Sequence, residues 1–195
     1  MMLFHSAFAV VTVLASFALS SYANPIHHGR TGLTATTTIS NPTPEGLISG
    51  LKKLQENVDT CSGDISKAAS MNTDPEDEMS SLNSFFLKLQ LPIATSIKLT
   101  PEQEKECSTV VAAVLAKAIK ACHEVAANHN FMKYYAKWTE TDIAMHSFMQ
   151  KIAGVSFAVY KQSLLRAGKS SATYLHDMKM RHMVNDFRGM GVSHE

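Results

Sequence analysis

The sequence predicts an all-α fold, an up-and-down bundle of about five amphipathic helices. Beyond residue 43, apolar residues recur in alternating steps of three and four, which is the spacing of one face of an α-helix. Three segments also begin with the same capping sequence. Runs of alternating polar and apolar residues, typical of half-buried strands, are missing from the sequence, and so is any strand–helix–strand pattern.

The first 23 residues have the pattern of a secretion signal. An apolar run from Ala7 to Leu19 precedes Ser21 and Ala23, the small residues that signal peptidase accepts before its cleavage site. The run is shorter than the roughly 20 apolar residues that span a bilayer. This stretch carries no Lys or Arg, so a membrane anchor is the alternative. We expect a secreted protein without a transmembrane segment, whose mature chain starts near Asn24.

The mature chain is expected to hold one domain between two flexible ends. Residues 24–43 mix Thr, Ser, Gly and Pro without a helical period, which indicates a flexible arm. The helical-bundle domain covers residues 44–188. Residues 189–195, which contain Gly189 and Gly191, are expected to form a disordered tail.

The first three helices are expected to begin at residues 43–45, 74–76 and 100–102, which read Thr-Pro-Glu, Asp-Pro-Glu and Thr-Pro-Glu. Thr or Asp caps the free N–H groups, Pro has no N–H to leave unpaired, and Glu suits the positive end of the helix dipole. Gln103 completes a capping box at the third helix. The second helix is expected to continue through a kink at Pro92 to Ile97.

The second half of the chain is also predicted to be helical. Thr139 or Thr141 caps a helix that stops at Gly168, and Ser170 or Ser171 opens a final helix. Because the links between the first three helices are short, consecutive helices should run antiparallel.

Three cysteines, Cys61, Cys107 and Cys122, follow the signal. In an oxidising compartment this number suggests one disulfide and one thiol, and three buried, unpaired cysteines are the alternative. With the first and third helices parallel, Cys61 lies about 26 Å along its helix, Cys122 about 31 Å along its own, and Cys107 only about 9 Å. A disulfide needs Cα atoms within about 7 Å. The expected pair is therefore Cys61–Cys122.

The stretch LTPEQEKECSTVVAAVLAKAIKACHEVAANHNFMKY, residues 99–134, resembles the central helix of the fungal hydrophobic surface-binding protein A family, which includes cell-wall galactomannoproteins. The order of elements is similar over roughly residues 45–187. The resemblance implies a secreted or cell-wall α-helical protein that adsorbs to hydrophobic surfaces, holds fatty acids between its helices or assists lipolytic enzymes. Three cysteines and a second half rich in aromatics and Met depart from the family's pattern.

Several other classes of function are not expected. The formal net charge of +1 gives no electrostatic footprint for nucleic acid and no strong attraction to anionic lipid. The segment from His123 to His129 resembles a zinc-protease helix, but that motif needs its second His four residues after the first, and residue 127 is Ala. No nucleophile elbow or phosphate-binding loop occurs. We expect no metal, no cofactor and no catalytic activity.

The expected function is binding of lipids, of the fatty-acid type, or of hydrophobic surfaces. The alternative is a secreted interaction module, an effector or a structural antigen of the cell wall, whose partner is a host protein. Apolar spacing selects the expected lining of a lipid site: Phe86, Leu89, Val111, Leu115, Ile119, Phe148, Met149 and Ile152. In the segment FMKYYAKW, the candidates for contact with a lipid or a solid surface are Phe131, Tyr134, Tyr135 and Trp138. The alternative for this segment is a connection whose rings close one end of the bundle.

Overall fold

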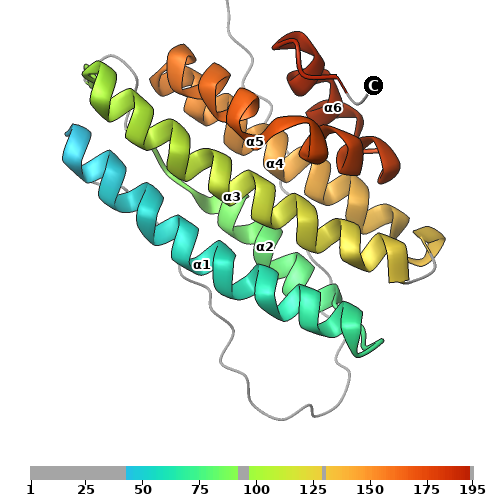
Figure 1. Cartoon of the computed structure of the whole chain (residues 1–195). Helices are drawn as coiled ribbons and strands as arrows, with labels where there is room; N and C mark the ends of the chain where they lie inside the picture. The colour runs from blue at the N-terminus through green and yellow to red at the C-terminus, as the bar shows by residue number, and fades with distance from the viewer. Residues whose placement is uncertain (1–42, 92–96, 129–130, 194–195) are drawn as a thin grey trace, which may run out of the picture. The chain divides into compact units, whose positions relative to one another are not determined.

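The computed structural model describes residues 43–91, 97–128 and 131–193. Within these ranges the chain forms six α-helices and one 3₁₀ helix and contains no β-sheet (Figure 1). The elements are α1 (Pro44–Ser70), α2 (Glu76–Lys88), α3 (Pro101–Asn128), η2 (Phe131–Tyr134), α4 (Tyr135–Val155), α5 (Phe157–Asp177) and α6 (Arg181–Gly189). The predicted all-α class is confirmed. The expected signal and all of the arm but Thr43 lie outside the described residues.

Helices α1 and α3 pack against each other and run parallel. Near their N-termini, the Gln103 side chain donates to Glu45 over 3.1 Å. Further along, Lys117 lies 3.5 Å from Asp59. The second contact lies the same number of residues after the first on both helices. The two helices therefore run parallel, as the sequence predicts.

Helix α5 packs on the other side of α3, again in the parallel direction. Ser156, just before α5, donates to Glu104 in the first turn of α3 over 3.0 Å. Toward the other end, the rings of His123 and Tyr174 stack with their centroids 4.1 Å apart. The helices α1, α3 and α5 therefore form one layer, with α3 in the middle (Figure 1).

Helices α2 and α4 form the second layer, which lies behind the first in Figure 1, and α6 packs against α4 and α5. Tyr134, at the start of α4, donates to Asp74 just before α2, and Lys151 in the last turns of α4 reaches Leu89 just after α2. Helices α2 and α4 therefore run parallel to each other. Consecutive helices from α1 to α5 alternate in layer and direction, so the up-and-down topology is confirmed. No helix within the described ranges is long and apolar enough to cross a membrane.

The N-terminal caps agree with the sequence. Thr43 accepts a hydrogen bond from the backbone N–H of Gly46, and the Asp74 carboxylate accepts one from Glu76. Thr100 and Gln103 form the expected capping box, in which each side chain accepts from the other's backbone N–H. These local signals place the starts of α1, α2 and α3 within one residue.

Helix α2 is shorter than predicted. It ends at Lys88 and does not continue to Ile97. Leu89 is already extended, and Leu91 precedes Pro92, which disfavours the helical conformation of the residue before it. The kink expected at Pro92 lies outside the described residues. Ile97 is buried but not helical.

The second half divides differently from the prediction. Helix α4 begins at Tyr135, before either expected cap, and breaks at Ser156, which is extended and caps α5 through Val159. Gly168 has φ 77° and is not helical, so it separates two helical stretches within α5, in agreement with the predicted stop at this residue. A separate helix, α6, follows a turn after Asp177.

The chain is ordered beyond the predicted end of the bundle. Gly191 has φ 80°, and the backbone N–H of Val192 bonds to the Phe187 carbonyl over 3.0 Å. The Val192 side chain is buried in the core. The expectation of a disordered tail is therefore wrong for residues 189–193, because an apolar side chain fastens this turn to the bundle; residues 194–195 lie outside the described ranges.

Candidate functional site

All eight residues of the predicted lipid lining belong to the hydrophobic core. They come from both layers, three from α3 and five from α2, the residue after it and α4. Phe86 and Phe148 meet with ring centroids 5.2 Å apart. In this conformation the lining is closed, because none of the eight is more than 1 % exposed. An acyl chain can reach these side chains only where the layers separate.

Lys151 on α4 marks one end of the lining. Its neighbours in sequence and in space, Phe148, Ile152, Phe86 and Leu89, are all lining residues. Its Nζ donates to the backbone carbonyls of Phe86, Leu87 and Leu89 over 3.3, 2.7 and 3.0 Å. The ammonium therefore caps the C-terminus of α2, whose carbonyls carry the negative end of the helix dipole.

Among the described residues, the Lys151 ammonium is stabilised by these neutral carbonyls alone. Within the described ranges, no carboxylate forms an ion pair with this ammonium. Desolvation by burial lowers the pKa of Lys151 below its usual value. An anionic head group would stabilise this partly desolvated cation, which lies beside an apolar lining.

Asn83 is a second polar group close to the lining, one helical turn before Phe86 on α2. Its side chain is buried, and neither its amide nitrogen nor its amide oxygen has a hydrogen-bond partner within the described part of the chain. A buried amide without partners costs about 1–3 kcal/mol relative to a satisfied one. The site therefore contains an amide able to bind a water molecule or a polar group of a ligand.

The aromatic segment divides between the core and the surface. Tyr134 and Trp138, each 2 % exposed, are buried, and their rings make an edge-on contact. Met132 and Tyr135 are exposed. The burial of Tyr134 and Trp138 supports the interpretation that rings of this segment close one end of the bundle. The prediction that these two residues contact a lipid or a solid surface is therefore wrong. The side chain of Phe131 lies outside the described residues.

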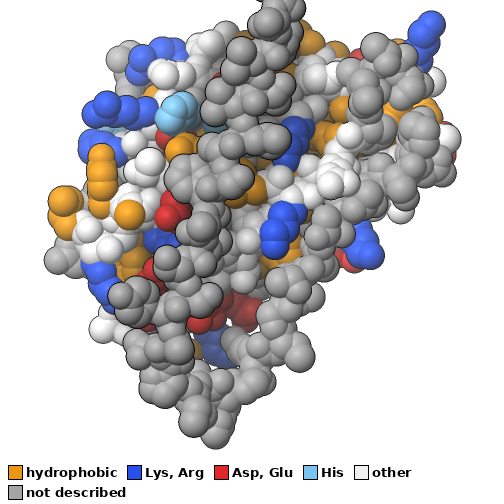
Figure 2. Space-filling model, turned by 180° about the vertical axis from the view of Figure 1, so that it is seen from behind, with side chains coloured by type: hydrophobic (Ala, Val, Ile, Leu, Met, Phe, Trp, Pro, Cys, Tyr) orange, Lys and Arg blue, Asp and Glu red, His pale blue; other side chains and the backbone are white. Residues whose placement is uncertain are grey.

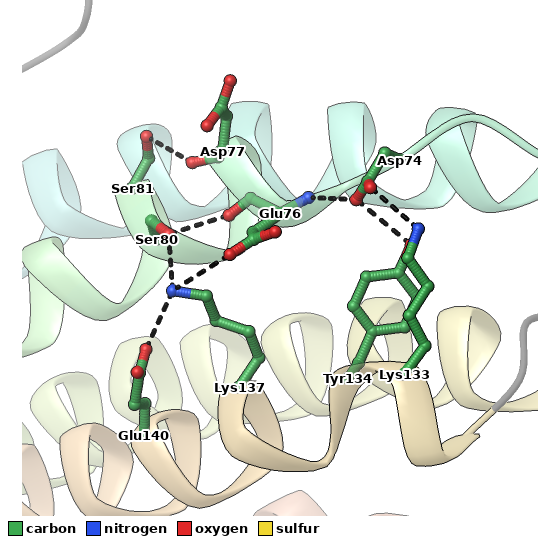
Figure 3. A network of polar contacts seen from close by, with 9 residues as sticks. All are labelled: Asp74, Glu76, Asp77, Ser80, Ser81, Lys133, Tyr134, Lys137 and Glu140. Atoms are coloured by element: carbon green, nitrogen blue, oxygen red, sulfur yellow. Dashed lines mark hydrogen bonds and ion pairs between the residues drawn. The ribbon is translucent and has the colours of Figure 1, made fainter. Parts of the chain in front are cut away.

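Polar contacts hold this segment against the start of α2 (Figure 3). Lys133 donates to Asp74 over 2.8 Å and Tyr134 donates to it over 3.1 Å. These bonds, the one from Lys133 first, lower the pKa of Asp74 below its usual value. One turn later, Lys137 lies between Glu76 and Glu140. The network joins α2 to α4 and has the character of a structural seam.

Exposed hydrophobic residues do not form one patch on the α2–α4 side. Leu87, Tyr135 and Ile143 are exposed there at separate points of the two helices. In Figure 2, which views the molecule from behind, hydrophobic side chains emerge in separate groups among lysines, arginines and acidic residues. This arrangement does not favour the aromatic segment as a broad contact surface.

The predicted disulfide is not formed, and all three cysteines are buried free thiols. Cys61 on α1 is near enough to Cys122 on α3 to contribute, after burial, to the raised pKa of Cys122, which agrees with their predicted level along parallel helices. The Cys61 thiol, however, turns to α2 and donates to the carbonyl of Glu78 over 3.1 Å. Burial raises the pKa of Cys61 and of Cys122 to about 12 and that of Cys107 to about 11. The alternative of three unpaired cysteines describes this structure.

A cluster between α4, α5 and α6 was not found by sequence analysis. The Asp142 carboxylate accepts from the backbone N–H groups of His182 and Met183 over 3.0 and 2.9 Å, and it contacts the His182 ring over 2.9 Å. Asp186 bonds to His146 over 2.7 Å and accepts from Tyr160. The partners are 26 to 41 residues apart in the chain, so no local spacing signals them.

These acid–imidazole pairs fasten α6 to the bundle. The rings of His146 and His182 lie next to each other, with centroids 5.5 Å apart. Burial and the charge of Asp186 raise the pKa of Tyr160 to about 12. No group of three His, Cys, Asp or Glu within the described ranges is arranged to hold a metal ion. His123 stacks on Tyr174 and lies 3.3 Å from Asp177, a packing role.

No protein-family model, no curated protein and no solved structure matches this chain.

Proposed function

We propose that the mature protein is a secreted, non-catalytic carrier of single-chain lipids with a carboxylate head, such as fatty acids. The acyl chain lies between the two layers, against the eight core residues of the lining. The carboxylate lies on Lys151. The observation that carries this proposal is the partly desolvated Lys151 ammonium, bonded to main-chain carbonyls at one end of an apolar lining.

The energetics favour such an exchange of contacts. Each buried CH₂ of an acyl chain contributes about 0.8 kcal/mol, so a long chain offsets the helix–helix contacts that it replaces. Helix α2 is the element suited to move, because it has 13 residues against 27 in α1 and 21 in α4. It supplies Phe86 to the lining, and Leu89 follows directly after it. The same opening would offer an apolar face to a hydrophobic solid.

The resemblance to the hydrophobic surface-binding family adds to this proposal. Its implications of secretion, of a cell-wall location and of fatty-acid binding agree with a signal-like N-terminus and an apolar bundle core. The cell wall is accordingly the proposed site of action outside the cell.

The test compares an acid with the matching alcohol. Delipidated protein is titrated with palmitate and with hexadecanol, and we expect Lys151→Met to weaken palmitate binding about 10- to 100-fold, the value of a charge-assisted hydrogen bond. Binding of hexadecanol should change little. The comparison within one variant removes any effect of the lost α2 cap on the fold.

Lys88→Met is the matched control, because Lys88 lies at the same end of α2 but is exposed. This variant should bind palmitate as the unaltered protein does. Native mass spectrometry of the secreted protein should also reveal a co-purifying fatty acid. Equal loss of acid and alcohol binding in Lys151→Met would remove Lys151 from the head-group site, and absence of binding to either probe would contradict the carrier function.

A further inference from the structure

The formal net charge of +1 hides an uneven distribution of charge. Residues 44–88, which form α1 and α2, contain eight Asp or Glu and four Lys, whereas residues 157–189, which form α5 and α6, contain six Lys or Arg and two Asp. Helix α3 lies between α1 and α5 (Figure 1). Within the first layer, α1 contains four Asp or Glu and three Lys, and α5, on the opposite side of α3, contains three Lys or Arg and one Asp.

The exposed face of α5 combines its positive charges with apolar side chains. Phe157, Lys161 and Leu165 follow one another at intervals of one helical turn, and Arg166, exposed about 100° further round the helix than Leu165, lies at the edge of this face. Phe157 is 60 % exposed and Leu165 is 41 % exposed. No Asp or Glu occurs between residues 157 and 176. The face thus combines apolar and cationic groups, and the one carboxylate of α5 is at its last residue, Asp177.

We propose that this face of α5 docks the protein onto an anionic lipid surface. Lys161 and Arg166 contact the phosphates of the head groups, while Phe157 and Leu165 enter the boundary between head groups and acyl chains. Lysines and arginines beside apolar residues on one helix face are the arrangement of helices that lie in this boundary. The negative charge of the lipid surface complements the basic side of the protein.

The apolar members of the row favour a membrane over a soluble polyanion. A soluble polyanion would contact only the basic side chains of the face. A lipid surface has phosphates for the basic side chains and, within the length of one side chain, hydrocarbon for the apolar ones. The face includes neither Lys151 nor any residue of the lipid lining, so this docking does not depend on the proposed carrier function. Docking onto a lipid surface places the protein where lipids are available.

The test is sedimentation of the mature protein with vesicles. We expect binding to vesicles of equal parts phosphatidylglycerol and phosphatidylcholine, and none to phosphatidylcholine alone. The double variant K161Q/R166Q should lower the partition coefficient about thirtyfold, because each basic residue near a charged membrane contributes roughly one fivefold factor. Added salt should weaken the binding by screening.

The matched control is K53Q/K67Q, which removes the same charge from exposed positions of α1. This control should bind the anionic vesicles as the unaltered protein does. Equal losses in the two double variants, or no binding to anionic vesicles, would overturn the proposal.

A second variant tests the apolar half of the face. Phe157→Ser should reduce binding to anionic vesicles and leave binding to soluble heparin unchanged, because only the membrane receives the ring. If Phe157→Ser changes neither, the face recognises polyanions in general and the lipid proposal is wrong. Lys151→Met should bind vesicles normally, so failure of the carrier function and failure of membrane docking give different results.

Discussion

Asp142 and His182 are joined twice, once through the backbone N–H of His182 and once through its imidazole, both on the same carboxylate oxygen. The other oxygen of Asp142 accepts from the Met183 backbone. A residue of α4 therefore provides the N-terminal cap of α6, whose first turn has no cap from its own side chains. Helix α6 has nine residues, too few for stability on its own, so its position depends on this carboxylate.

We expect Asp142→Asn to loosen α6 selectively. The amide retains one acceptor and loses the charge, which costs about 1–3 kcal/mol for a buried, charge-assisted set of bonds. Hydrogen–deuterium exchange should become faster across residues 181–189 and stay unchanged in α1.

The control for this variant is Asp59→Asn, since Asp59 makes an exposed ion pair with Lys117. Exposed pairs contribute at most about 1 kcal/mol, so this change should leave the exchange of α6 unaltered. Unchanged exchange in α6 of Asp142→Asn would mean that Asp142 does not hold that helix.

Replacing each of two glycines with similar neighbours in sequence by alanine should change the free energy of unfolding in opposite directions. Gly154 lies inside α4 with open space around its missing Cβ, so Gly154→Ala should stabilise by roughly 0.5–1 kcal/mol. Gly168 also has open space, but its φ of 77° strains any L side chain, so Gly168→Ala should destabilise by about 1–2 kcal/mol. Urea unfolding measures both. A stabilising Gly168→Ala would mean that α5 runs through this position without a kink.

Asn83→Leu should stabilise the ligand-free protein, contrary to the usual result of changing a buried residue. The amide of Asn83 has no partner within the described part of the chain, so a leucine of similar volume removes its desolvation cost, about 1–3 kcal/mol. Thermal unfolding of delipidated protein is the measurement. A lower melting temperature would show that the amide binds an ordered water in the ligand-free protein.

What the sequence predicts well here is local. Thr43 and Thr100 cap helices through partners three residues away, and the apolar stripes determine which faces are buried. The capping of the α2 carbonyls and the position of α6 depend on Lys151 and Asp142, whose partners lie more than 39 residues away. Only the fold brings such partners together. The net charge of the whole chain does not reveal the basic face of α5 for a similar reason, because it sums the charges of helices that the fold places apart.

The cysteines predict a loss of stability at alkaline pH. An unfolded thiol ionises near pH 9.0, whereas burial raises the pKa of Cys122 to about 12 in the folded protein. Above pH 9 the unfolded state therefore binds fewer protons than the native state, and the free energy of unfolding falls as the pH rises toward the folded pKa. The slope approaches about 1.4 kcal/mol per pH unit for each buried thiol.

The measurement is urea unfolding between pH 8 and 11 for the unaltered protein and for Cys122→Ala, about three units that lie across the titration. Because lysines and tyrosines titrate in both proteins, the difference between the two isolates Cys122, and it should shrink with rising pH. A thiol reagent should label three cysteines after denaturation and none before, since the thiols are buried. A difference independent of pH, with one thiol labelled after denaturation, would indicate that the purified protein contains the Cys61–Cys122 disulfide and that the free-thiol state does not persist in an oxidising compartment.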